Sequence, residues 1–474
     1  MTEPVRLASR WTKVATAWLP FADAASADLP LGRLLRLALF QVSVGMAAVL
    51  LNGTLNRVMI VELSIPAWLV ALMIAIPLLV APFRALIGHR SDTHRSVLGW
   101  RRVPFIWFGT LMQFGGLAIM PFALLLLGRP EDVSLGVVAS MLAFLLTGAG
   151  MHMTQTAGLA LATDLAPEDK RPRAVALLYV MLLLGTMVAA LAMGALLADF
   201  SPTRLVQVIQ GAAVLTFALN LVALWKQEAR GAALPPPSDT TPRFAELWRG
   251  FVAQGRTARL LAAIGIGAAG FAMQDALLEP YGGEILALSV GATTALTGAW
   301  AAGALAGFAL SGRSLARGGD PLRLAGNGLV VGVSAFLMIL FAAPFQSVAL
   351  LFAGACAIGL GLGLFSVGTL IEAMGLARDE GAGLALGAWG AVQASCAGLA
   401  IALGGALRDL VSSLAAGGLF GGALGSPATG YAAVYGIEIL LLLAGLVALG
   451  PLVNQNRERA FVATGPFGLR EFPT

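Results

Sequence analysis

The chain has 474 residues, of which 58% are hydrophobic and 12% are charged. A soluble globular protein carries about 25% charged residues, so this composition excludes that class and indicates a polytopic membrane protein. The excess of 30 Lys and Arg over 25 Asp and Glu does not predict a nucleic-acid partner, because the basic residues fall almost wholly in loops between apolar runs, where membrane topology requires them.

The N-terminal segment, which precedes the first long apolar run, has apolar and basic residues on different faces of a predicted helix. Trp11, Val14 and Trp18 recur at helical spacing, while Arg10 and Lys13 occupy another face of the same helix. This pattern is typical of an amphipathic helix that lies on the cytoplasmic membrane surface. A disordered basic leader that only sets the orientation of the chain is the alternative interpretation.

Twelve apolar runs follow, each long enough to span about 30 Å of hydrocarbon at about 1.5 Å per residue. They cover residues 36–60, 65–87, 103–127, 136–163, 174–198, 204–225, 259–281, 288–311, 324–344, 347–376, 384–408 and 431–453. The longest polar segment separates the sixth run from the seventh. A weak internal repeat, which aligns Leu63 and Ser64 with Leu288 and Ser289, supports a division into two halves at that segment.

The predicted organisation therefore has five parts. They are a cytoplasmic N-terminal segment (1–34), an N-terminal six-helix half (35–225), a cytoplasmic linker (226–258), a C-terminal six-helix half (259–453) and a cytoplasmic tail (454–474). With both termini inside, the basic residues near the outer side are Arg57, Arg129, Arg204 and Arg408, and the other Lys and Arg residues lie inside. This asymmetry predicts the orientation of the whole chain.

The loop between the second and third runs resembles the helix 2 to helix 3 loop signature of the major facilitator superfamily of transporters. Gly88 ends one helix, Asp92 follows four positions on, and spaced arginines including Arg95 lead to a Gly-x-Arg-Arg sequence that ends in Arg101 and Arg102. The resemblance implies an all-α polytopic membrane protein with the major facilitator fold, in which twelve transmembrane helices form two six-helix halves.

These loop residues also make a candidate cytoplasmic gate. Asp164 lies in the charged turn between the fourth and fifth runs, where Arg171 and Arg173 are within reach. Together with Gly88, Asp92, Arg95, Arg101 and Arg102, it is predicted to latch the cytoplasmic side of the transporter. A solvated charged turn is the alternative interpretation.

Enzyme motifs are absent from the sequence. It has no Gly-x-x-x-x-Gly-Lys phosphate loop, no His-Glu-x-x-His and no nucleophile elbow. We therefore do not expect an ATP-driven pump or a membrane hydrolase.

His152 is the first candidate for a binding site. It lies about eleven residues, or roughly 17 Å, from the cytoplasmic end of the fourth run, which places it near the middle of the bilayer. Neutral imidazole is a good ligand for a metal such as the magnesium of a tetrapyrrole, and carriers bind substrate near this depth. Gln155 and Gln113 are the polar candidates around it. The alternative is a packed histidine that bonds to Gln155 or to a threonine of a neighbouring helix.

Three acidic residues inside or near apolar runs are candidates for proton coupling. Asp275 and Glu279 are four positions apart, which predicts one shared helix face and favours a shared proton. Pro280 is predicted to break the seventh helix near the outer surface, where a solvated helix end is the alternative. Glu438 lies deeper, where a charged side chain costs about 2.5 to 3.5 kcal/mol, so we expect it to be paired, protonated or facing a cavity.

Four longer stretches, residues 11–36, 83–95, 155–168 and 274–284, resemble the bacteriochlorophyll delivery family. That family contains the PucC-like and LhaA-like proteins of purple phototrophic bacteria, and this chain is most similar to the LhaA-like branch, which is associated with the core light-harvesting antenna. The resemblance covers nearly the whole chain.

The resemblance implies a non-enzymatic assembly factor in the bacterial inner (intracytoplasmic) membrane. Such a protein delivers bacteriochlorophyll to light-harvesting 1 antenna polypeptides, or holds those polypeptides while pigment is inserted. Further partners that it implies are the reaction centre, enzymes of bacteriochlorophyll synthesis, membrane lipid and a second copy of the chain. His152 is then expected to be an axial ligand of the pigment magnesium.

Two other functions stay open at this point. One is a proton-coupled carrier of another amphipathic small molecule, in which Asp275, Glu279 and Glu438 relay protons. The other is a non-transporting chaperone whose lipid-facing surface binds single-span antenna polypeptides.

Overall fold

The computed structural model describes residues 24, 29–79, 99–167, 170–228, 255–376, 382–419, 421 and 425–456. The first half of the chain holds α2 (Leu31–Leu37), α3 (Leu39–Val49), η2 (Leu50–Thr54), α4 (Leu55–Arg57), η3 (Val58–Glu62), α5 (Ala67–Leu79), α7 (Val103–Leu127), α8 (Val133–Leu165), α9 (Arg171–Leu196) and α10 (Pro202–Leu224). The second half holds α12 (Gly255–Ala272), η6 (Met273–Ala276), α13 (Leu278–Leu286), α14 (Val290–Ala316), α15 (Pro321–Ala342), α16 (Val348–Leu376), α17 (Ala382–Ala416) and α18 (Ala428–Asn456).

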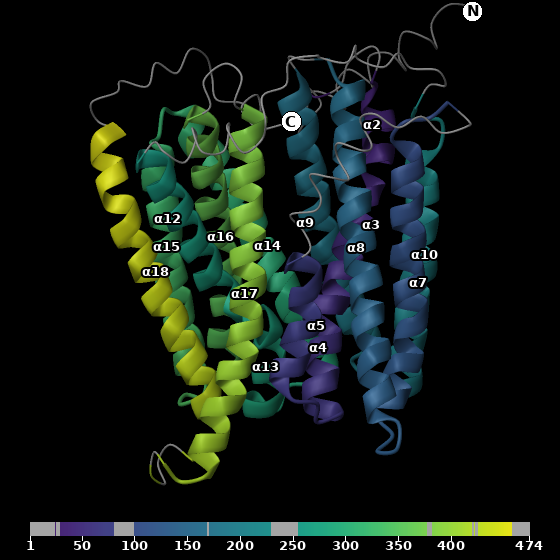
Figure 1. The fold of residues 1–474 in the computed structure, drawn as a ribbon, viewed down its shortest axis with the longest axis vertical. Coiled ribbons are helices and arrows are strands. Elements are labelled where there is room, and N and C mark those ends of the chain that lie inside the picture. Colours follow the sequence, from purple (N-terminus) through teal and green to yellow (C-terminus); the bar gives the residue numbers. More distant parts are fainter. Residues whose placement is uncertain are drawn as a thin grey trace, which may run out of the picture.

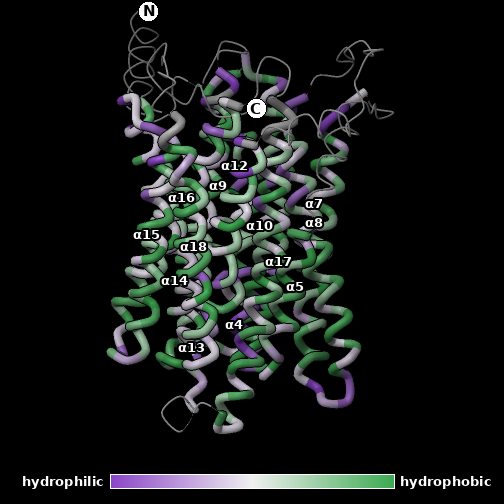
Figure 2. Tube along the Cα trace, turned by 60° about the vertical axis from the view of Figure 1, so that its left-hand side comes forward, coloured by the Kyte–Doolittle hydropathy of each residue, from purple (hydrophilic) through white to green (hydrophobic). Residues whose placement is uncertain are grey.

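These helices account for the predicted membrane crossings. Within the described ranges, 11 helices are long and apolar enough to cross a membrane, and the shorter apolar helix α5 supplies the remaining crossing. The rest of that predicted second run, from residue 80 on, lies outside the described residues. Hydrophobic residues follow the helices through the middle of the bundle, and hydrophilic residues gather toward its two ends (Figure 2). The predicted all-α polytopic fold is confirmed.

The two halves of the chain form two groups of helices that lie side by side (Figure 1). Helix α2 begins, and helix α18 ends, at the same end of the bundle, as an even number of crossings requires. We call this the upper end, as drawn in Figure 1, and the opposite end the lower end. Most of the predicted N-terminal segment, linker and tail lies outside the described residues.

Glycine allows several of these helices to touch backbone to backbone. A Cβ atom on Gly303 would lie 1.8 Å from the carbonyl oxygen of Cys356, and one on Gly359 would lie 2.0 Å from that of Trp300. These two contacts join α14 to α16. Small residues are therefore required there, because any side chain would force the helices apart.

The seventh crossing is broken, but not where the sequence predicted. The α-helix stops at Ala272, a 3-10 turn covers Met273–Ala276, and α13 then runs through Pro280 without a break. Pro280 lies in the first turn of α13, where a missing N–H leaves no hydrogen bond unmade. The predicted shared helix face of Asp275 and Glu279 is therefore wrong, since the two residues belong to different helical segments.

Candidate functional site

Glu279 is a buried carboxylate at the junction of the two halves. Thr297 Oγ1 donates a hydrogen bond to Glu279 Oε1 at 2.7 Å, and Asn56 Nδ2 donates to Oε2 at 3.3 Å. Thr297 belongs to the second half and Asn56 to the first, so the two halves share this carboxylate. Asn56 lies in α4, a short stretch between two π-helical segments, which are rare and are frequent at functional sites.

The same amide also reaches Asp275. Asn56 Nδ2 lies 3.2 Å from the main-chain oxygen of Asp275. The structure therefore brings Asp275 and Glu279 together through a residue of the opposite half, and not through the helical spacing on which the prediction relied.

Three further hydrogen bonds join the halves in the lower part of the bundle. Thr54 and Thr294 share a hydrogen bond of 3.1 Å, Arg57 Nη2 donates to the carbonyl oxygen of Leu288 at 3.3 Å, and the main-chain N–H of Trp68 donates to Asp409 Oδ2 at 2.8 Å. Together with the Asn56 contacts they form what we call the lower seal. The halves are held together at this end.

Glu438 completes an acid cluster with Asp275 and Glu279. It is fully buried on α18, and its Oε1 accepts the main-chain N–H of Gln274 at 2.8 Å. The side chain of Gln274 in turn donates to Asp275. Glu438 Oε2 and the hydroxyl of Tyr435 are both buried with no hydrogen-bond partner among the described residues. A buried carboxyl group without a full set of partners is costly in a membrane, so this cluster is a candidate for proton exchange.

His152 lies half-buried in the middle of α8. Gly150 and Thr154, two positions before and after it, form the face that packs on α7, where a Cβ on Gly150 would lie 2.5 Å from Gln113 N. Since residues two apart on a helix point in nearly opposite directions, His152 lies on the side of α8 turned away from α7. Gly148, one turn before His152 on the same face of α8, packs on Pro77 of α5, so this face is turned toward α5.

The structure places one of the two predicted glutamines beside His152. Gln155 Nε2 donates to Gln41 Oε1 of α3 at 3.4 Å, which gives a polar contact one turn from the imidazole. Gln113 is fully buried, and its Nε2 donates to the carbonyl oxygen of Ser43 at 3.1 Å. Because Gln113 lies on the α7 side of α8, it is not brought together with His152.

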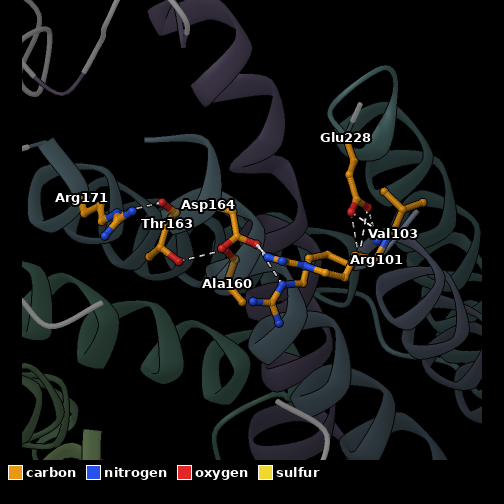
Figure 3. Close-up of polar contacts among 8 residues, drawn as sticks. Arg101, Val103, Ala160, Thr163, Asp164, Arg171 and Glu228 are labelled. Carbon is orange, nitrogen blue, oxygen red and sulfur yellow. Dashed lines mark hydrogen bonds and ion pairs between the residues drawn. The ribbon is translucent and has the colours of Figure 1, made fainter. Parts of the chain in front are cut away.

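The described part of the predicted gate forms a charged cluster at the upper end (Figure 3). Asp164 Oδ2 accepts hydrogen bonds from Arg101 Nη2 at 2.6 Å and from Arg102 Nε at 3.0 Å. All three residues belong to the first half of the chain, so this contact braces one half internally. Gly88, Asp92 and Arg95 lie outside the described residues, and the latch between halves stays a prediction.

Glu228 caps the same cluster from beyond the end of α10. Its carboxylate accepts the main-chain N–H groups of Arg101, Arg102 and Val103 at 2.7 to 3.1 Å (Figure 3). These donors lie at the start of α7, where a helix has unsatisfied N–H groups and favours negative charge.

We expect Glu228→Ala to lower the free energy of unfolding by about 0.5 to 2 kcal/mol, the usual effect of losing a helix cap. The midpoint of thermal unfolding of the purified protein in detergent would fall accordingly. Glu131→Ala is the matched control, because Glu131 is exposed in the loop between α7 and α8. Equal midpoints for both variants would contradict the capping role.

Comparison with known proteins now decides the family. A family model described as PUCC protein matches residues 54–457, which is most of the chain. The chain belongs to the PucC family. It is 53% identical over 469 residues to a Rhodobacter capsulatus protein described as "uncharacterized protein in puhA-bchM intergenic region", and the match covers 97% of this chain and 98% of that relative.

Further matches agree with this family. Protein PucC of Rhodovulum sulfidophilum is 56% identical over 411 residues, covering 85% of this chain and 90% of the relative. A more distant relative, 28% identical over 436 residues and covering 90% of this chain and 97% of its own length, is described as "bacteriochlorophyll synthase 44.5 kDa chain" of Rhodobacter capsulatus. This PucC-family chain is therefore a membrane protein related to photosynthesis.

A solved structure shares the fold. A bacterial homologue of the human lysosomal transporter Spinster, in an inward-facing and unoccupied conformation, superimposes with a TM-score of 0.67 at 15% identity. The match covers 91% of this chain and 98% of that one. The predicted major facilitator fold of the PucC-family chain is confirmed.

The sequence alone did not indicate three of the site residues, Asn56, Thr297 and Gln274. Each is an uncharged polar residue within or beside an apolar run, and that was the only signal available. Asn56 and Glu279 are 223 positions apart, so no local pattern could pair them.

Proposed function

We propose that this PucC-family protein binds bacteriochlorophyll and delivers it to light-harvesting 1 antenna polypeptides in the bacterial inner (intracytoplasmic) membrane, with both termini in the cytoplasm. The family, the transporter fold and the distant relative with a bacteriochlorophyll-related name support this function. Reaction centres, enzymes of pigment synthesis and a second copy of the chain are further expected partners.

The position of His152 is the observation that carries the proposal. Its imidazole comes from the middle of a membrane helix, on the side turned away from α7 and toward α5, one turn from the polar pair Gln155 and Gln41. Magnesium in a tetrapyrrole takes a neutral nitrogen ligand, and the ring also needs an apolar site with a few polar groups for orientation. In the proposed site, His152 is the ligand of the magnesium, and Gln155 contacts the edge of the ring. Gln113, on the other side of α8, is left out of the site.

The acid cluster supports a second function, a proton-coupled carrier of another amphipathic molecule. Glu279 accepts hydrogen bonds from both halves, and a carboxylate is a stronger acceptor than a carboxylic acid. Protonation of Glu279 would therefore weaken the lower seal and couple proton uptake to a movement of the halves.

An absorption spectrum with pigment extraction tests the proposed function. The protein would be purified in mild detergent from cells that make bacteriochlorophyll and freed of antenna polypeptides. Stoichiometric bacteriochlorophyll is the expected result. A colourless, folded protein that still captures antenna polypeptides would contradict the proposed function and favour a non-transporting chaperone. A colourless, folded protein that also fails to capture antenna polypeptides would favour the proton-coupled carrier.

A further inference from the structure

A groove runs along the membrane-facing surface between α9 and α10. These helices follow each other in the chain but contact each other little, and both also pack on α3, which forms the floor of the groove between them. The groove has a volume of about 440 Å³. Its lining residues include Val42 and Met46 of the floor, Gly185 and Ala189 of α9, and Gly211 and Leu215 of α10.

The groove is open to the lipid hydrocarbon. Val188 and Leu196 on the α9 wall are 59% and 56% exposed, and Leu215 on the α10 wall is 49% exposed. In a helix that crosses a membrane, exposed side chains of this kind face acyl chains and not water. The walls and floor are apolar along most of the length.

The lower end of the groove is polar. Arg204 and Gln207, in the first two turns of α10, line it there. Arg204 Nη1 lies 3.8 Å from Asp199 Oδ2, but the Asp199 side chain is 97% exposed, so water weakens this ion pair. A guanidinium has five N–H donors, and Arg204 can therefore bind a second anion.

The length of the groove matches one leaflet of a bilayer. Arg204 and Leu219 line its two ends along α10, and a helix rises by roughly 22 Å over the fifteen positions that separate them. One leaflet with its headgroups is about 20 to 22 Å thick. A cationic group thus lies at headgroup depth, at the lower end of an apolar channel whose other end lies near the middle of the bilayer.

The groove is too small for a transmembrane helix to lie inside it. A helix about 10 Å wide and 20 Å long occupies roughly 1,500 Å³, more than the groove encloses, so a helix could only cover its mouth. A single flexible hydrocarbon chain is narrow enough to enter.

We propose that this groove binds one anionic phospholipid, with an acyl chain between α9 and α10 and its phosphate at Arg204 and Gln207. The site is separate from the proposed pigment site on α8 and does not depend on it. The lipid fills a gap that the helices leave against α3, and it makes this face of the bundle selective for anionic lipid.

Native mass spectrometry of the delipidated full-length protein, titrated with phosphatidylglycerol or phosphatidylcholine, tests the proposal. We expect one tightly bound phosphatidylglycerol per chain. Arg204→Gln should weaken its binding about five-fold, the usual contribution of one basic residue near a membrane surface, and should remove the preference over phosphatidylcholine. Arg129→Gln removes an exposed arginine at the same end of the bundle. It should change neither the affinity for phosphatidylglycerol nor the preference over phosphatidylcholine.

A second variant fills the groove. A Cβ on Gly211 meets no atom within 4 Å, so Gly211→Leu can occupy the groove without displacing a helix. We expect it to abolish the tight binding of phosphatidylglycerol. Gly115→Leu is the matched control, because Gly115 of α7 has equal open space but lies outside the groove.

Two results would overturn the proposal. One is equal binding of phosphatidylglycerol by Gly211→Leu and Gly115→Leu. The other is a Gly211→Leu variant that no longer captures antenna polypeptide but binds lipid as before, while Gly115→Leu still captures the polypeptide. That result would make the groove a protein-binding surface. Pigment content, measured on the same samples, reports on the proposed function separately, and the groove variants should leave it unchanged.

Discussion

Replacing His152 with leucine is expected to reduce the bacteriochlorophyll bound to the purified protein by roughly tenfold or more. Loss of groups that only support a metal ligand already costs about 10- to 100-fold in affinity, and loss of the proposed ligand itself should cost no less. Leucine keeps an apolar side chain of similar size in the half-buried position. Extracted pigment per mole of protein, with the absorption spectrum, is the measurement.

Two further variants separate ligation from packing at this position. His152→Gln should retain part of the pigment, because magnesium also accepts a carbonyl oxygen. Met153→Leu changes the adjacent half-buried side chain of α8 without touching the proposed ligand, and it should bind pigment like the unmodified protein. If the leucine variant at 152 folds and keeps its pigment, His152 is a packing residue and the site lies elsewhere.

The second large effect is expected at the lower seal. Asn56→Leu removes the amide that bonds to Glu279 and to the main-chain oxygen of Asp275. Leaving a buried acceptor without its donor costs about 1 to 3 kcal/mol, and 1.4 kcal/mol corresponds to a tenfold change in an equilibrium. We therefore expect the population of molecules open at the lower end to rise by about tenfold or more.

Spin labels at Arg129→Cys and Phe345→Cys would report this opening. Both positions are exposed in lower-end loops, one in each half of the chain, and Cys356 and Cys396 would first be replaced by serine. Electron spin resonance should show a longer distance between the labels in the Asn56→Leu variant.

The matched control is a second buried asparagine. Asn220 accepts a hydrogen bond from Ser43 Oγ at 2.6 Å and donates to Thr110 Oγ1 at 3.0 Å, all within the first half. Asn220→Leu should lower stability without lengthening the distance across the lower end. Identical distance distributions in the unmodified protein and in a folded Asn56→Leu variant would show that Asn56 does not hold the halves together.

The partners of the charged residue Asp164 could not be predicted from neighbouring sequence. The charged turn after α8 suggested Arg171 or Arg173 as partners for Asp164, yet the structure pairs Asp164 with Arg101 and Arg102, more than 60 positions earlier. Loop residues distant in sequence meet because helix packing brings the ends of α7 and α8 to one place. The charges were visible in the sequence, but their partners were not.

The sequence by itself determined the membrane class, the number and approximate bounds of the crossings, the two halves and the family. It could do so because a chain in lipid must satisfy every backbone hydrogen bond within a helix, so length and hydropathy alone mark the spans. Only the tertiary structure decided that the seventh helix breaks before Pro280, that Gln113 lies apart from His152, and that Asn56 bonds to Glu279. Those outcomes depend on which faces of distant helices pack together. A helix that is hydrophobic on all sides has no amphipathic pattern, so its sequence does not show which face packs against which neighbour.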